Sequence, residues 1–179
     1  MYGLVNRAIE GLVLEKFGQD AWRRICKRAQ LGQPNFVAME AYDDAITYGL
    51  VAAASAELGM KPEAILEAFG EYWTQYTIEE GYGNLLSMMG NTLEEFLENL
   101  DSMHARVGGT MPQLVPPSFE REPQPDGSSI LHYRSDREGL APMVLGLLKG
   151  LATRFGVRLE VRQLEPAAPG HERFLVRTI

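Results

Sequence analysis

The sequence has a single cysteine, Cys26, in 179 residues. One cysteine excludes an intrachain disulfide and a zinc site built from paired cysteines. Two arginines shortly before Cys26 could lower its thiol pKa, but a buried, inert cysteine on a helix is the favoured interpretation. The cysteine usage fits a reducing compartment, and the N-terminus lacks the layout of a signal peptide. We therefore expect a cytoplasmic protein.

Long apolar runs and basic clusters are also missing. No apolar stretch approaches the roughly 18 residues that a membrane span needs, so no membrane-spanning segment is predicted. The formal net charge is −7. An acidic surface argues against nucleic acid or an anionic membrane as a partner, because phosphate binding needs clustered Lys and Arg.

Enzyme signatures are equally scarce. The sequence has no GxSxG motif, no phosphate-binding loop and no GxGxxG fingerprint. The carboxylates of Glu79-Glu80 and of Glu94-Glu95 are adjacent, so neither pair can share one helix face for acid–base chemistry. We predict that the protein is not an enzyme.

Helical periodicity dominates the first two-thirds of the chain, where Gly18 separates two short helices. A capping box at Thr92–Glu95 opens a further helix, which we expect to run unbroken to Gly108-Gly109. Three more helices are predicted, over residues 43–58, 62–76 and 84–89.

The pattern changes after Pro112. Alternating residues predict four strands, over 118–122, 129–136, 157–163 and 173–178, and a helix over 140–155. Helices first and an antiparallel sheet later indicate an α+β fold: a mostly helical N-terminal part, then a C-terminal lobe with a four-stranded antiparallel sheet and helices.

His104 lies on the apolar face of the helix that begins after Thr92, at helical spacing from Leu97 and Leu100. A buried imidazole must find a partner or cost up to about 3 kcal/mol. One interpretation, favoured by the spacing alone, is a core histidine bonded to a backbone carbonyl. The other is a metal ligand. No second His or Cys stands at zinc-ligand spacing, so a single ligand points to heme, whose porphyrin supplies four nitrogens.

A second candidate site is the segment from Tyr133 to Arg137. In a strand, the side chains of Tyr133, Ser135 and Arg137 project from the same face. Two hydroxyls and a guanidinium suit anionic oxygens, and arginine can pair with a carboxylate through two bonds. For these five residues alone, a solvated strand face is the simpler interpretation.

Several segments together carry a family resemblance. They are Met1–Asn6, Tyr48–Ser55, Phe69-Gly70, Glu80–Tyr82, Phe96–Asp101 with His104 after it, and Arg137–Leu140. The chain resembles the heme-nitric oxide/oxygen binding (H-NOX) family over essentially its whole length. That family includes the heme domain of soluble guanylate cyclase and stand-alone bacterial sensors.

The resemblance implies one domain over residues 1–179, with an N-terminal helical subdomain (1–60) and a heme-ligating α+β subdomain (61–179). Heme b (iron protoporphyrin IX) is expected to be buried between these lobes. His104 matches the proximal ligand of the iron, and Pro117 matches a proline that presses on the porphyrin. Tyr133, Ser135 and Arg137 match the motif that binds the propionates. The distal pocket is matched by Val5, Ile9, Trp73, Met143 and Leu147.

The resemblance also bears on the gas. Members that bind oxygen stably carry a tyrosine where this sequence has Met143, which donates no hydrogen bond. One bond donated to a charged acceptor contributes about 1.5–3 kcal/mol, or roughly ten- to a hundredfold in affinity. A nitric oxide sensor is therefore expected, with CO as a further ligand. The indole N–H of Trp73 is a remaining donor that could alter this preference.

Signal transduction is expected to run through the His104 helix and relaxation of the heme to a separate partner protein. The resemblance implies a histidine kinase or a cyclic-dinucleotide enzyme. Three alternatives stay open: an oxygen-binding or oxygen-storage heme protein, a heme-dependent enzyme such as a peroxidase, and an interaction domain without cofactor.

Overall fold

The computed structural model describes residues 1–179 as an α+β fold, which confirms the predicted class. The helices are α1 (Gly3–Arg28), α2 (Asp44–Leu58), α3 (Pro62–Thr77), the π-helical turn η1 (Ile78–Tyr82), α4 (Gly83–Ser87), α5 (Leu93–Glu98), α6 (Leu100–Gly108) and α7 (Ala141–Phe155). The strands are β1 (Ser118–Pro123), β2 (Ser129–Arg134), β3 (Leu159–Ala168) and β4 (His171–Thr178). They form one antiparallel sheet in the order β1-β2-β4-β3.

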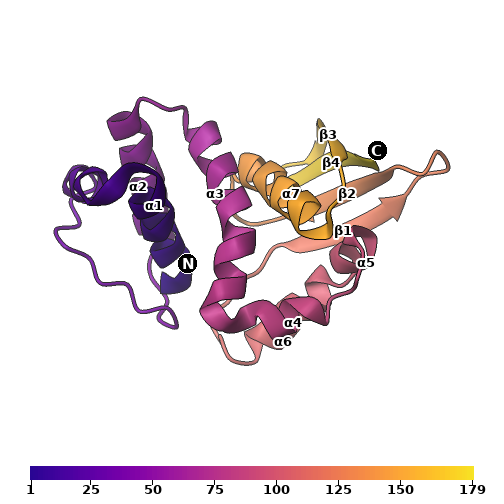
Figure 1. Ribbon diagram of the computed structural model, residues 1–179, viewed down its shortest axis with the longest axis horizontal. Coiled ribbons are helices and arrows are strands. Elements are labelled where there is room, and N and C mark those ends of the chain that lie inside the picture. The colour runs from indigo at the N-terminus through magenta and orange to yellow at the C-terminus, as the bar shows by residue number, and fades with distance from the viewer.

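The elements are arranged around two hydrophobic cores. α1 and α2 lie at one end of the molecule, α3 runs through its middle, and α7 lies between α3 and the sheet (Figure 1). The first core is built mainly from α1, α2 and α3 and includes Ile25, Leu50 and Phe69. The second lies between α5, α7 and the inner face of the sheet and includes Leu148 and Phe174. The subdomain boundary at residue 60 stays a prediction.

The contact between α3 and α7 is the most extensive between any two elements. A Cβ atom at Gly70 would lie 2.1 Å from the carbonyl oxygen of Met143, and one at Gly146 would lie 1.9 Å from the carbonyl oxygen of Glu67. Only glycine allows backbones to approach this closely. Glycine on both helices therefore fixes their close separation.

The prediction of one unbroken helix after Thr92 is wrong. The structure has two helices, α5 and α6, which meet at Asn99, where φ is −95° and ψ is 0°. The side-chain amide of Asn99 donates to the carbonyls of Met89 and Glu95, each at 2.9 Å. Such side chain–backbone bonds compete with helical pairing. His104 therefore belongs to a short separate helix, α6.

The predicted extent of the second strand, residues 129–136, is also wrong, because β2 ends at Arg134. Ser135 begins a turn in which its hydroxyl oxygen accepts a bond from the backbone N–H of Arg137 at 3.0 Å. The backbone N–H of Ser135 donates to the carbonyl of Gly170 at 2.9 Å. Tyr133, Ser135 and Arg137 therefore do not share one strand face.

Two smaller differences complete the comparison with the expected elements. β3 begins later and extends further than residues 157–163, and β4 begins at His171, before the expected residue 173. Gly18 lies inside α1 with the non-helical angles φ 79° and ψ 174°, which confirms the predicted break. None of the helices combines the length and the apolar character that crossing a membrane would take.

Candidate functional site

A cavity of about 280 Å³ lies where α1, α2, α3, α6, β2 and α7 meet. Of its 32 lining residues, 24 are hydrophobic, as expected for a site that buries a mostly apolar ligand. All ten residues predicted from the sequence line it: Val5, Ile9, Trp73, His104, Pro117, Tyr133, Ser135, Arg137, Met143 and Leu147. The structure thus brings together residues that are far apart in sequence, while their individual roles toward heme stay predictions.

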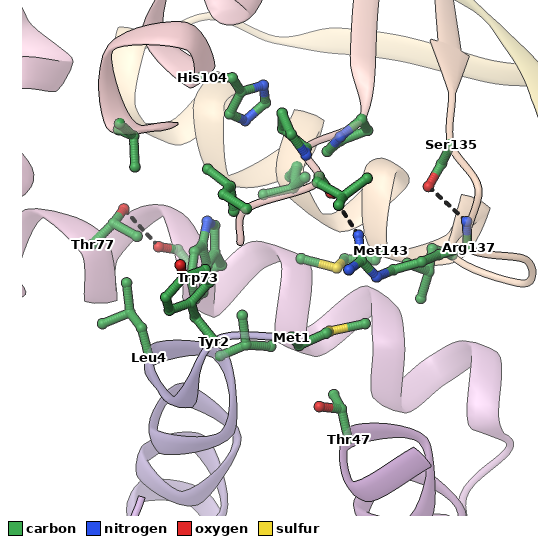
Figure 2. A pocket seen from close by; sticks show the side chains of 18 of the residues that line it. Met1, Tyr2, Leu4, Thr47, Trp73, Thr77, His104, Ser135, Arg137 and Met143 are labelled. Carbon is green, nitrogen blue, oxygen red and sulfur yellow. Dashed lines mark hydrogen bonds between the residues drawn. The ribbon is translucent and has the colours of Figure 1, made fainter. Parts of the chain in front are cut away.

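His104 projects into this cavity from α6, facing Trp73, Met143 and Tyr2 across it (Figure 2). Its Nδ1 atom is buried and has no hydrogen-bond partner. A core histidine would normally satisfy its buried nitrogens. Burial lowers the pKa of His104 below its ordinary value, against the opposing effects of Asp101 and the Pro117 backbone. The ring is therefore neutral at pH 7, which is the form that binds metals.

Tyr133, Ser135 and Arg137 form a polar end of the cavity. Tyr133 is buried on β2, and burial raises the pKa of its hydroxyl, which stays a hydrogen-bond donor at neutral pH. Ser135 and Arg137 reach the same cavity from the turn after β2 (Figure 2). Although they do not share a strand face, the three side chains still present two hydroxyls and a guanidinium to one space.

Asp44 on α2 holds Arg137 in place, and sequence reasoning missed it. The Nε of Arg137 donates to Oδ2 of Asp44 at 2.7 Å, and its Nη1 donates to the carbonyl of Val115 at 2.6 Å. Asp44 also pairs with the N-terminal ammonium of Met1. Burial raises the pKa of Asp44, but bonds from that ammonium and from Arg137 outweigh it and lower the pKa. Arginine carries five N–H donors, so others are left for a ligand carboxylate.

The wall of the cavity across from His104 is mainly apolar at Met143, and Trp73 and Tyr2 carry its polar groups. Val5 and Ile9 come from α1, and Met143 and Leu147 come from α7. Thr77 also lines the cavity and was not predicted, but its hydroxyl donates to the carbonyl of Trp73 at 2.9 Å. The hydroxyl of Thr77 is therefore already committed within α3.

Tyr2 is a second lining residue that the sequence did not reveal. Its hydroxyl oxygen accepts a bond from the backbone N–H of Gln113 at 3.0 Å. The nearby indole of Trp73 packs against Phe69 and Tyr76, with ring centroids 5.9 and 6.2 Å apart. The sequence pattern gave no signal for Tyr2, because Gln113, its hydrogen-bond partner, is 111 positions away.

A porphyrin needs the three things that this cavity offers: an imidazole for the iron, cationic and hydroxyl donors for two carboxylates, and apolar walls for the ring. The neutral imidazole of His104, which projects into the cavity, fits the first, and the Tyr133–Arg137 segment fits the second. This combination is what a heme-binding sensor domain requires.

A family model described as "Haem-NO-binding" matches residues 2–163. The chain belongs to this family, the H-NOX domains, as its sequence had indicated. It is accordingly a heme-binding gas-sensor domain.

Curated relatives are much longer than this chain. Soluble guanylate cyclase gcy-35 of Caenorhabditis elegans is 36% identical over 158 residues, which cover 86% of this chain and 23% of that protein. Guanylate cyclase soluble subunit beta-2 of Rattus norvegicus is 41% identical over 93 residues, covering 52% of this chain and 14% of that protein. The chain spans less than a quarter of these relatives, so their cyclase activity does not transfer to it.

Solved structures share the fold. An H-NOX protein from S. oneidensis in the Fe(II)NO ligation state has a TM-score of 0.88 at 17% identity, covering 100% of this chain and 99% of that chain. An oxygen-binding H-NOX domain in its oxygen complex has a TM-score of 0.81 at 20% identity, covering 99% and 94%. One structure holds NO and the other holds oxygen, so the fold alone does not determine the gas.

Proposed function

We propose that this domain binds heme b through His104 and senses nitric oxide. The observation that carries the choice of gas is the apolar side of the cavity, where Met143 offers no donor and the hydroxyl of Thr77 is committed to the carbonyl of Trp73. Stable oxygen binding gains about 1.5–3 kcal/mol from a donated hydrogen bond. Nitric oxide depends on such a bond far less, so this cavity favours it.

The chain's own residues divide the work of holding the cofactor. His104 offers a neutral imidazole to the iron, and Tyr133, Ser135 and Arg137 offer donors to the propionates. Pro117 lies on the loop after α6, and we assign to it the contact with the porphyrin that the resemblance implied. When bound, heme would supply an iron coordination position for a diatomic gas.

An oxygen-binding protein is the second candidate. Trp73 lines the cavity and carries an indole N–H, for which the structure shows no acceptor. This donor is the specific observation that favours oxygen. CO, which accepts hydrogen bonds weakly, is a further ligand of either candidate.

We propose that the output lies in another domain or protein, reached through the helix that carries His104. The curated relatives are soluble guanylate cyclases in which the matched region is a minor part. They favour a nucleotide cyclase as the partner over the histidine kinase or cyclic-dinucleotide enzyme implied by stand-alone bacterial sensors.

The visible spectrum of the purified, heme-reconstituted and reduced protein tests this proposal. We expect a Soret band that shifts with NO and with CO and that shows no long-lived oxygen complex in air. A protein that stays colourless after heme addition would refute heme binding altogether. A long-lived oxygen complex would overturn only the selectivity and would favour the second candidate.

A further inference from the structure

The chain that follows His104 passes from one hydrophobic core to the other. At the start of α6, the carboxylate of Asp101 accepts bonds from the backbone N–H of Phe119 and the hydroxyl of Ser118, both at 2.8 Å. These bonds tie α6 to the sheet. Shortly after α6, Met111 is only 4% exposed and lies within the first core, among the side chains of α1 to α3. α6 and residues 109–117 therefore connect the two cores.

Tyr2 holds this connecting loop from the N-terminal side. Its hydroxyl oxygen accepts the backbone N–H of Gln113 at 3.0 Å, a bond that joins positions 111 residues apart. Tyr2 itself is firmly placed: it is 7% exposed, belongs to the first core and forms a β-bridge with Ala41. The loop at Gln113 is thus bonded to a buried residue that directly precedes α1.

Tyr2 is also bonded to a residue that lines the cavity. The carbonyl of Tyr2 accepts the backbone N–H of Val5 at 3.0 Å, in the first turn of α1. Val5 lines the cavity. On the other side of the loop, Arg137 holds the carbonyl of Val115. The loop after the His104 helix therefore has two hydrogen bonds, one to Tyr2 in the first core and one to Arg137 at the polar end of the cavity.

We propose that Tyr2 is a positioning residue that transmits displacement of the His104 helix to α1 through its bond to Gln113. The inference rests on the proposed function, because it needs a ligand that displaces His104. Without the Tyr2 bond, the loop absorbs the movement of α6 and the N-terminal helices stay still.

Hydrogen exchange measured by NMR or mass spectrometry tests this inference with the variant Tyr2→Phe. In the heme-free protein, the Gln113 N–H should exchange about three- to tenfold faster than in the wild type, because a neutral hydrogen bond is lost. In the heme-loaded wild type, NO should change exchange in both α6 and the first turns of α1. In Tyr2→Phe the change in α6 should persist, while the change in α1 should disappear.

Tyr42→Phe is the matched control. The Tyr42 hydroxyl also accepts a backbone N–H, that of Val37 at 3.0 Å, and it donates to Glu40, but it makes no bond to the loop. We expect this variant to keep the NO-induced change in α1. If Tyr42→Phe loses it as well, the effect is a general loosening of the first core and the inference is wrong.

The outcomes separate the inference from the function on which it rests. A wild-type-sized response of α1 in Tyr2→Phe overturns the role of Tyr2 and leaves NO sensing intact. No response of α6 to NO in the wild type contradicts signalling through the His104 helix itself. If Tyr2→Phe does not fold, Gln113→Pro removes the donor and keeps Tyr2, and the same loss of the α1 response is expected.

Discussion

The two sides of the cavity differ in what they offer a ligand and in where their residues come from. The anchoring groups are His104 on α6 and the Tyr133–Arg137 segment, which spans the end of β2 and the turn after it. The opposite side comes from α1, α3 and α7 and has Trp73 as its one predicted donor. Holding the cofactor and choosing the gas are thus assigned to different elements. Substitutions on one side should therefore affect one property and spare the other.

The largest expected effect is on the anchoring side. His104→Gly should weaken heme binding by at least about tenfold, since even loss of a residue that only supports a metal ligand costs ten- to a hundredfold. Heme retained after gel filtration, followed by the Soret band, measures this effect. Added imidazole should restore the band by filling the space. Unchanged retention without imidazole would show that another residue is the ligand.

On the opposite side, Met143→Tyr should leave heme retention unchanged and strengthen oxygen binding by about ten- to a hundredfold, through one donated bond. Oxygen dissociation followed by stopped flow measures the gain. Met143→Phe is the control, because it adds a ring of similar size without a hydroxyl. If both variants gain equally, shape and not hydrogen bonding sets the preference.

The side opposite the anchoring groups depends on the close contact of α3 and α7. Gly146→Ala should destabilise the fold by about 1–3 kcal/mol, because its methyl group would overlap the backbone of Glu67. Urea denaturation of the heme-free protein measures the loss. Gly49→Ala is the control: a Cβ atom there meets nothing within 4 Å, and a small gain in helix stability is expected. If both variants have the same free energy of unfolding, α3 and α7 can move apart without destabilising the fold.

The smallest effect concerns pH and the turn that carries Ser135. His132 on β2 is partly buried, and its Nδ1 lies 2.9 Å from Nε2 of His171. His171 follows Gly170, whose carbonyl accepts the backbone N–H of Ser135. Burial and the neighbouring cations, Arg134 foremost, lower the pKa of His171. An unfolded histidine titrates near pH 6.5, so below that pH the unfolded chain binds more protons than the folded one.

The free energy of unfolding should therefore fall as pH drops from about 6.5 through the lowered pKa of His171. Urea denaturation at pH 7.5 and 5.5 measures this loss, and His171→Asn should reduce it. A variant that keeps the full wild-type loss would assign the pH dependence to other groups.

The sequence predicted what depends on neighbours along the chain. The capping box was correct for the cap itself, because the hydroxyl of Thr92 accepts the N–H of Glu95 at 3.2 Å. The return bond differs, since the Glu95 carboxylate accepts the N–H of Asn91, one residue before the cap, at 2.8 Å. The break at Asn99 was missed because it needs the carbonyl of Met89, which only the folded chain brings near.

The same distinction applies to the site. The ten lining residues were found because a family pattern relates them, although periodicity alone did not make His104 a ligand. Asp44 and Tyr2 were missed because their bonds join residues 93 and 111 positions apart. No local pattern signals such pairs.

The glycine contact between α3 and α7 has a consequence for how such domains diverge. It fixes the helix backbones through Gly70 and Gly146, while Trp73 and Met143 project from the same two helices into the cavity. Ligand-facing side chains can therefore be exchanged over generations without moving the helices that carry them. Gas preference and folding stability can then vary separately, as is consistent with one architecture serving both an NO-bound and an oxygen-bound protein.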